Sequence, residues 1–270
     1  MGDFGKQIRL SRILRRDRGT LVVAFDHALI LGPIPGTTDP AGQIKRLVEA
    51  KADAVLLNLG NIRHFADAVS SGFPPGLIAR LDWTTAFNES AAGSPNGFQT
   101  CLVAHPEDAL RSGADAVITF LFVGSGDADF EKKEVRRVGS LARECERLGM
   151  PLIVESLARG AQVQKPRDAK WLMLHTRMAV ELGADVIKTE NAEDGETMRR
   201  VVGACPVPIL VLGGSRTGSD EEVVDTVRNI MHSGAAGVFF GRNIFQSANM
   251  SELLLRIHSA LTDKASVQGK

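Results

Sequence analysis

The chain has 270 residues, of which 44% are hydrophobic and 24% are charged, and its formal net charge is zero. This length provides a complete hydrophobic core, either as one α/β barrel or as two small domains. The balanced charge lacks the electrostatic footprint of a nucleic-acid-binding or membrane-surface protein. We therefore expect a small molecule as the partner, with no nucleic acid and no membrane.

The N-terminal residues 1–18 are basic, and Leu10, Ile13 and Leu14 have the spacing of one helix face. They predict a short helical cap. No apolar segment of signal-peptide type follows, and no run approaches the ~20 residues of a membrane span. The three cysteines are scattered and form no C-x-x-C pair, which is typical of a reducing compartment. We therefore expect a cytoplasmic protein.

One phrase recurs along the chain, as KADAV at 51–55, GADAV at 113–117, GADVI at 183–187 and GAAGV at 234–238. In each copy an amphipathic run ends and an apolar, β-branched run begins, which indicates a helix C-terminus followed by a strand. The four copies indicate one (βα)₂ unit that is repeated about four times.

The residues between these copies complete a set of predicted strands, mostly continuous apolar runs as expected for parallel strands covered on both faces. The predicted strands are 21–26, 54–58, 77–82, 115–121, 152–156, 185–188, 208–212 and 237–240. Helical patterns lie between them, most clearly at 127–148, 168–182 and 220–233, and Ser219 with Glu222 forms a capping-box pattern. These units predict a TIM (β/α)₈ barrel in a single domain of residues 1–270; a doubly wound open sheet is the alternative.

In a TIM barrel, functional side chains gather where the strands end. The predicted strand ends carry many polar residues, namely Asp26, His27, Asn58, Asp82, Trp83, Glu155, Ser156, Lys188, Thr189, Gly213, Gly214, Ser215, Gly241 and Arg242. A structural protein has little reason to place so many polar groups on one rim, so the pattern favours an enzyme. We expect Asn58, Asp82, Trp83 and Arg159 to contact substrate, although Trp83 could instead pack under the loop of residues 86–104.

Lys188 ends an apolar run, where burial of an ammonium group is costly. A surface lysine in a salt bridge is the simpler interpretation. The functional interpretation is a Schiff-base nucleophile, because apolar neighbours such as Val186 and Ile187 could desolvate the amine and lower its pKa from about 10.4. The amine would then condense with a ketone, and the resulting iminium would stabilise the carbanion formed when a C–C bond breaks.

Glycine turns follow the last two predicted strands. Gly213, Gly214 and Ser215 follow the seventh, and Gly241 and Arg242 follow the eighth. Glycine lets backbone N–H groups approach an anion closely, and arginine adds a fixed positive fork. Loops after strands seven and eight are the usual phosphate site of this fold, so we expect a substrate phosphate here.

These features together resemble the class I aldolase family of archaeal-type fructose-bisphosphate aldolases and 2-amino-3,7-dideoxy-hept-6-ulosonate synthases. The matching stretches are FDHALILGPIPG (25–36), ADAVLLNLGNIRH (52–64), PLIVESLARG (151–160), GADVIKT (183–189), LGGSRT (212–217) and AGVFFGRNIFQ (236–246). The resemblance implies that Lys188 is the Schiff-base lysine, that Asp26 is the acid of a D-H motif, and that the two glycine turns with Arg242 hold a substrate phosphate. It also implies a homo-oligomer of barrels.

The chain departs from that family at Leu157, where the family usually has a tyrosine that donates and accepts protons. This chain contains no tyrosine. Three groups could take over the proton transfer: Asp26 is the first candidate, Glu155 the second if its side chain points into the barrel, and His27 the third because its pKa is near neutral.

The histidines show no metal-ligand spacing, so no metal and no cofactor are expected. The leading functional hypothesis is an aldolase that cleaves or forms a C–C bond in a phosphorylated ketose. Alternatives are transfer of a ketol unit, as in the heptulosonate synthases, and transfer of an acyl unit, as in the thiolase of autoinducer-2 phosphate breakdown. A barrel that binds a sugar phosphate without turnover is a further alternative.

Overall fold

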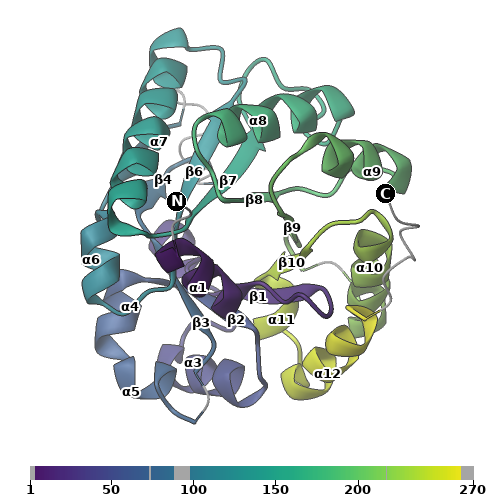
Figure 1. The fold of residues 1–270 in the computed structure, drawn as a ribbon. Coiled ribbons are helices and arrows are strands. Elements are labelled where there is room, and N and C mark those ends of the chain that lie inside the picture. Colours follow the sequence, from purple (N-terminus) through teal and green to yellow (C-terminus); the bar gives the residue numbers. More distant parts are fainter. Residues whose placement is uncertain (1–3, 73, 88–97, 217, 263–270) are drawn as a thin grey trace.

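Eight parallel strands close into a barrel in a computed structural model that describes residues 4–72, 74–87, 98–216 and 218–262 (Figure 1). The strands, in spatial order, are β1 (Thr20–Ala24), β10 (Gly237–Phe240), β9 (Ile209–Leu212), β8 (Val186–Thr189), β7 (Leu152–Ala158), β6 (Ala116–Val123), β3 (Gly76–Arg80) and β2 (Ala54–Asn58). Because β1 pairs with both β10 and β2, the sheet has no edge. The prediction of a TIM barrel is confirmed, and the open sheet is wrong.

Helices surround the barrel and alternate with its strands (Figure 1). They are α2 (Ala28–Leu31), α3 (Pro40–Glu49), α4 (Leu59–His64), α5 (Ala66–Val69), α6 (Pro106–Arg111), α7 (Ala128–Leu148), α8 (Ala169–Glu181), α9 (Gly195–Ala204), α10 (Asp220–His232), α11 (Arg242–Phe245) and α12 (Met250–Ala260). The predicted helices at 127–148, 168–182 and 220–233 correspond to α7, α8 and α10. The predicted capping box is present, since Ser219 and Glu222 exchange side-chain and backbone hydrogen bonds. Within the described residues, no helix is long and apolar enough to cross a membrane.

The structure differs from the predicted strands at several ends: β1 stops at Ala24 and β3 at Arg80, each two residues before the predicted end. After β3, the short strands β4 (Asp82–Thr84) and β5 (Thr100–Leu102) form an antiparallel pair where we expected a loop. In addition, β6 and β7 continue past their predicted ends, because Phe122 pairs with Leu157 and Val123 pairs with Ala158. Leu157 therefore lies within a strand and not in a loop.

Alternation along the strands decides which side chains enter the barrel. On β8, Val186 lies in the apolar cluster inside the barrel, whereas Ile187 packs outward against the helices. Lys188 is therefore on the inner face, one layer above Val186. On β7, Ile153 is inside in the same way, which places Glu155 on the inner face of the next layer.

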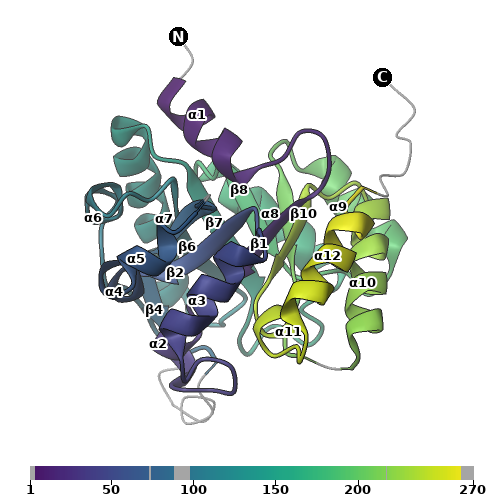
Figure 2. The same ribbon diagram turned by 90° about the horizontal axis from the view of Figure 1, so that it is seen from below.

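The helix α1 (Phe4–Ile13) covers one end of the barrel, while α2 and α11 lie at the opposite end (Figure 2). Its Ile13 is fully buried and joins the apolar cluster inside the barrel, with Leu10 and Leu14 packed beside it. The amphipathic spacing in the N-terminal segment thus has a direct structural cause: one face of α1 closes the barrel.

The aspartates of the repeated phrase attach this N-terminal segment to the barrel. Asp53 accepts hydrogen bonds from Arg15 and Arg18, Asp115 accepts one from Arg12, and Asp185 pairs with Lys6 at 3.1 Å. Each aspartate also accepts a backbone N–H from the start of a preceding barrel strand, from Leu21, Leu77 and Leu152 respectively. The repeated aspartate thus joins neighbouring strands and holds α1 in place.

Replacing Asp53 with asparagine is expected to lower the free energy of unfolding by about 1.5–3 kcal/mol near neutral pH, the scale of a hydrogen bond to a charged group. Burial raises the pKa of Asp53, but hydrogen bonds from Arg18 and from the Leu21 N–H outweigh burial and hold it below its ordinary value. The stabilisation is therefore present above the unfolded pKa of about 3.9 and is lost as the pH falls through the folded pKa.

Urea denaturation of the wild type and of Asp53→Asn, at about pH 7 and at about pH 3, measures the difference in their free energies of unfolding. The control is Asp17→Asn, which makes the same charge change at an exposed residue of the same segment. An equal loss of stability in the control, or a difference for Asp53→Asn that is the same at both pH values, would contradict the prediction.

Candidate active site

Lys188 lies inside the barrel mouth and is 6% exposed. Its Nζ is 2.8 Å from Glu155 Oε1 and 4.5 Å from the centre of the Phe239 ring. Glu155 is the register partner of Lys188 on the neighbouring strand β7, so the two side chains point to the same side of the sheet. A lysine in this position is screened from bulk water and has a proton acceptor within hydrogen-bond distance.

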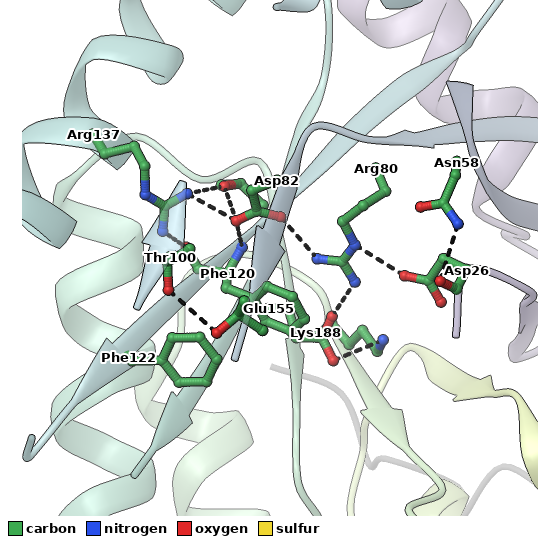
Figure 3. Close-up of polar contacts among 12 residues, drawn as sticks. Asp26, Asn58, Arg80, Asp82, Thr100, Phe120, Phe122, Arg137, Glu155 and Lys188 are labelled. Atoms are coloured by element: carbon green, nitrogen blue, oxygen red, sulfur yellow. Dashed lines mark hydrogen bonds and ion pairs between the residues drawn. The ribbon is translucent and has the colours of Figure 1, made fainter. Parts of the chain in front are cut away.

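Glu155 is held between two cations, as Figure 3 shows. One of its carboxylate oxygens contacts Lys188, and the other accepts a hydrogen bond of 2.5 Å from Arg80. Burial raises the pKa of Glu155, but the positive charges of Lys188 and Arg80 outweigh burial and hold the pKa below its ordinary value. Glu155 is therefore a carboxylate at neutral pH and can accept a proton.

Arg80 is the central residue of the polar network, and it was not among the residues predicted from the sequence. It is fully buried on β3, donates to Asp26 at 2.9 Å and to Asp82 at 3.3 Å, and lies 4.1 Å from the Phe120 ring centre. The signal that identified Lys188, a charge within an apolar strand, was also present here, since Arg80 interrupts the run LIARLD.

Asp82 lies between Arg80 and Arg137 and does not line the cavity. Its carboxylate accepts hydrogen bonds from the Phe120 N–H at 2.7 Å and from Arg137 at 2.8 Å, so it joins the barrel wall to α7 (Figure 3). Trp83 lies on β4 and donates to the Leu29 carbonyl at 3.1 Å.

Asn58 donates to the Asp26 carbonyl at 3.0 Å. Asn58, Asp82 and Trp83 do not line the cavity, and their contact with substrate stays a prediction. The third strand was predicted to reach Asp82, but β3 ends at Arg80 and Asp82 begins the hairpin of β4 and β5, which the sequence pattern did not reveal.

Asp26 and His27 follow β1 and both line the cavity. Burial raises the pKa of Asp26, but Arg80, His27 and Lys188 together lower it below its ordinary value. Burial is also the main reason that the pKa of His27 is lowered, which leaves the imidazole neutral at pH 7. Asp26 accepts a hydrogen bond from Arg80, whereas Lys188 lowers the pKa of Asp26 through its charge alone.

The two glycine turns lie next to each other, after β9 and β10. The Asn243 side chain donates to the Gly213 carbonyl at 3.0 Å and joins the turns. Side chains would not fit here: a Cβ on Gly213 would lie 2.5 Å from Asn243, and a Cβ on Gly241 would lie 2.3 Å from His27. Gly214 has a φ of 67°, which also favours glycine.

Arg242 has an unsatisfied donor in this region. Its Nε is buried and has no hydrogen-bond partner among the described residues, and desolvation lowers the pKa of its guanidinium. An unsatisfied buried donor on a cation is costly, and an anion would satisfy it. The geometry is suited to a phosphate group.

One cavity of about 440 Å³ connects these groups, a volume within the range of small-molecule sites. The predicted residues that line it are Asp26, His27, Glu155, Arg159, Lys188, Gly213, Gly214, Ser215, Gly241 and Arg242. Within the part of the chain that the structure describes, no group of three or more histidine, cysteine, aspartate or glutamate side chains is arranged to hold a metal ion.

Leu157 also lines the cavity and is 1% exposed. It packs in an apolar cluster with Phe120, Phe122 and Phe130. A leucine at this position provides packing and no proton, in agreement with the sequence, where Leu157 stands in place of a tyrosine.

A family model described as DeoC/LacD family aldolase matches residues 20–247, which run from β1 to just past α11. This chain belongs to that family. The match covers the whole barrel, including every residue of the cavity named above. The resemblance stated from the sequence motifs is thereby confirmed, and the chain is an aldolase-family protein.

Relatives support the same conclusion over nearly the full length. The chain is 34% identical over 272 residues to a 2-amino-3,7-dideoxy-D-threo-hept-6-ulosonate synthase of Halobacterium salinarum, covering 98% of this chain and 94% of the relative. It is 30% identical over 267 residues to a 3-hydroxy-5-phosphonooxypentane-2,4-dione thiolase of an Enterobacter species, covering 98% of this chain and 84% of the relative.

Solved structures of fructose-bisphosphate aldolases have the same fold. A crystal structure of an archaeal fructose 1,6-bisphosphate aldolase superposes with a TM-score of 0.82 at 25% identity, covering 95% of this chain and 99% of the other. A structure described in work on the Schiff-base-forming fructose 1,6-bisphosphate aldolase gives the same TM-score, identity and coverage. The fold and the aldolase family are thus shown by independent comparisons.

Proposed function

We propose that this chain is a class I aldolase in which Lys188 forms a Schiff base with a phosphorylated ketose. The observation that carries this proposal is the contact of 2.8 Å between Lys188 Nζ and the Glu155 carboxylate, inside a cavity that also contains the unsatisfied Arg242 Nε. A nucleophile, a base and an anion site within one cavity are the parts that such chemistry requires.

The proposed reaction begins when Lys188 passes a proton to Glu155 and its neutral amine attacks the ketone carbon. The carbinolamine then loses water, with Glu155 returning the proton to the departing hydroxyl, and an iminium results. Glu155, again a carboxylate, next takes the proton of the C4 hydroxyl. The C3–C4 bond breaks, its electron pair moves into the iminium to form an enamine, and an aldehyde leaves. Protonation of the enamine carbon by Glu155 and hydrolysis release the second product and free Lys188.

Glu155 supports this role better than Asp26 does. Glu155 touches the Lys188 amine, whereas the hydrogen-bonded contact of the Asp26 carboxylate is with Arg80. A general base must lie within hydrogen-bond distance of the proton it moves. We therefore place Glu155 first and Asp26 second, which reverses the order suggested by the sequence. Arg80 would keep both carboxylates ionised and in position.

Replacing Arg242 with alanine is expected to raise KM for a phosphorylated ketose by about 10- to 150-fold, the equivalent of a charge-assisted hydrogen bond of about 1.5–3 kcal/mol. The reason is that the buried Nε has room for an acceptor that the substrate phosphate would supply. Steady-state kinetics with phosphorylated and dephosphorylated forms of one ketose measure the effect. The exposed Arg199→Ala is the matched control. An unchanged preference for the phosphorylated form in Arg242→Ala would contradict the prediction.

Borohydride reduction tests the proposed function directly. Incubation with dihydroxyacetone phosphate or fructose phosphates, followed by reduction and peptide mass mapping, should label Lys188. Labelling of a different lysine, or no labelling while the substrate is consumed, would overturn the Schiff-base proposal. If these compounds raise the melting temperature but are neither trapped nor turned over, the chain is a sugar-phosphate-binding barrel without catalysis.

A transfer reaction is the second candidate. It is supported by the relatives, which are described as a heptulosonate synthase and a thiolase. The same Lys188 enamine could be captured by a second aldehyde instead of a proton, which would move a ketol unit. Product analysis with and without an added acceptor aldehyde distinguishes transfer from simple cleavage.

We also infer that the protein acts as a cytoplasmic homo-oligomer. Exposed apolar side chains support an interface, since Phe4 and Ile8 on α1 are 71% and 57% exposed and Leu255 on α12 is 70% exposed. Light scattering coupled to size exclusion measures the oligomeric state, and a monomer at micromolar concentration would contradict this inference.

A further inference from the structure

The charges that line the cavity are paired in a way that limits what it can bind. Three carboxylates and four cations line it, and they are Asp26, Glu155, Glu190, Arg80, Arg159, Lys188 and Arg242. Every one of these carboxylates forms an ion pair with one of these cations. Among the lining residues that the structure describes, Arg242 is the cation that has no carboxylate partner. The cavity therefore has one free positive charge for an anionic group.

Arg159 is neutralised by a residue that the sequence analysis did not consider. Its two terminal nitrogens donate to both oxygens of Glu190, at 2.9 Å and 2.8 Å, in a bidentate pair. One of these nitrogens also donates to the Ala158 carbonyl at 2.7 Å. The pair is largely buried, with side-chain exposures of 26% and 16%, so water screens it less than a surface pair.

The strand order places this pair on the other side of Lys188 from the phosphate site. Arg159 follows β7 and Glu190 follows β8, whereas Gly213 and Arg242 follow β9 and β10. The spatial order is β10, β9, β8, β7, with Lys188 on β8. A ketone carbon bound to Lys188 has two substituents. If the one that carries phosphate lies toward β9 and β10, the other extends toward Arg159 and Glu190.

We propose that the cavity selects ketose monophosphates and that Glu190 excludes substrates with a second phosphate at the distal end. This inference rests on the proposed function, because it uses Lys188 as the point of attachment. It names a substrate class, a ketose with phosphate on C1 and an uncharged distal end, and it assigns Glu190 as a specificity residue.

The physical reason is a competition for Arg159. A distal phosphate would approach the Glu190 carboxylate, and two negative groups at contact distance repel strongly where water is scarce. Binding to Arg159 would also require the phosphate to displace a bidentate carboxylate that is already in place. The neighbouring wall is apolar, with Phe87 6.0 Å from the Arg159 guanidinium carbon and Leu157 nearby in the lining. Carbon and hydroxyl groups suit this wall, and a second dianion does not.

The test compares fructose 1-phosphate with fructose 1,6-bisphosphate on the wild-type protein and on Glu190→Gln. Glutamine has nearly the same shape and still accepts a hydrogen bond from Arg159, but it removes the negative charge. The quantity compared is the substrate concentration that gives half-maximal borohydride labelling of Lys188. For the wild type, we expect this concentration to be at least about tenfold lower for fructose 1-phosphate than for fructose 1,6-bisphosphate. In Glu190→Gln this preference should fall by about 10- to 100-fold, which is about 1.4–2.8 kcal/mol at 1.4 kcal/mol per tenfold.

Two controls separate this inference from the proposed function. Glu193→Gln makes the same charge change at an exposed residue of the same loop and should leave the preference unchanged. Dihydroxyacetone phosphate has no distal group, so its labelling of Lys188 tests the Schiff-base chemistry alone. Calorimetric titration of both fructose phosphates measures the preference even if no label forms.

The outcomes are distinct. If dihydroxyacetone phosphate labels Lys188 but the wild type binds both fructose phosphates equally, Glu190 does not exclude a second phosphate and the inference is wrong. A monophosphate preference that is the same in wild type and Glu190→Gln also overturns the role of Glu190. If dihydroxyacetone phosphate does not label Lys188, the proposed function fails, while the calorimetric preference and its loss in Glu190→Gln still decide the selectivity of the cavity.

Discussion

Replacing Lys188 with methionine is expected to reduce kcat by at least about 10⁴-fold, on the scale reported when a covalent nucleophile is removed. Methionine has a similar length and is apolar, so it fills the space beside Phe239 but cannot form an imine. Glu155 keeps its hydrogen bond from Arg80 in this variant, so no buried carboxylate loses all its partners.

The fold should therefore survive the substitution. Circular dichroism and the melting temperature check the fold, and single-turnover kinetics with a phosphorylated ketose check the activity. Lys165→Met, at an exposed position beyond β7, is the control for the loss of one positive charge. A Lys188→Met protein that retains more than a few per cent of the wild-type rate would show that another group carries the chemistry.

The lysine that we propose as the Schiff-base residue could be predicted from the sequence because its signal is local. A charged residue at the end of an apolar strand is unusual, and the GADVI phrase fixed where that strand begins. The same reasoning predicted that the two glycine turns would line the cavity, since glycine at 213 and 241 follows two clear strands. The barrel itself followed from the repeated phrase and the lengths of its units.

The ion-pair network could not be predicted in this way, because it depends on barrel closure. The network joins residues from three strands: Asp26 follows β1, Arg80 ends β3 and Glu155 lies on β7. These side chains meet only because the closed sheet turns all three positions toward the barrel axis. The partners of the repeated aspartates were hidden for the same reason, since α1 reaches them from outside the repeats. The position of Asp82 outside the cavity lining was not predicted, because the β4–β5 hairpin has no strong strand signal.

Replacing Glu155 with glutamine is expected to lower kcat by about 10²–10⁴-fold, the usual contribution of a positioned acid–base group. Glutamine preserves the shape and can still accept hydrogen bonds from Arg80 and Lys188, but it cannot take a proton. Asp26→Asn should lose less, because Asp26 reaches the amine only through charge. His27→Ala should lose least, since among the described residues the buried Nδ1 of His27 has no hydrogen-bond partner.

The pH dependence of kcat/KM provides a second test of Glu155 as the proton-transfer group. The pKa of Glu155 is held below its ordinary value, so the carboxylate persists as the pH falls to about 4.3, the unperturbed pKa. The acid limb of kcat/KM in the wild type should therefore lie below that pH, and it should be absent in Glu155→Gln over the range where the protein stays folded. If all three variants retain rates near the wild type, none of these groups carries the proton transfer.

Leu157→Tyr addresses the remaining alternative, that the site works poorly only because it lacks the family tyrosine. The Leu157 side chain is buried against Phe120 and Phe122, and a phenol placed there would displace that packing and bring its hydroxyl toward Glu155 and Lys188. Because Glu155 already lies 2.8 Å from the amine, a second acid–base group has no vacant step to fill. We therefore expect Leu157→Tyr to leave kcat unchanged or lower it in the wild-type background. The double variant Leu157→Tyr with Glu155→Gln, in which that step is open, measures whether the phenol can fill it. A rescue of ten-fold or more in the double variant would show that the tyrosine and Glu155 do the same work, and that this barrel replaced one with the other.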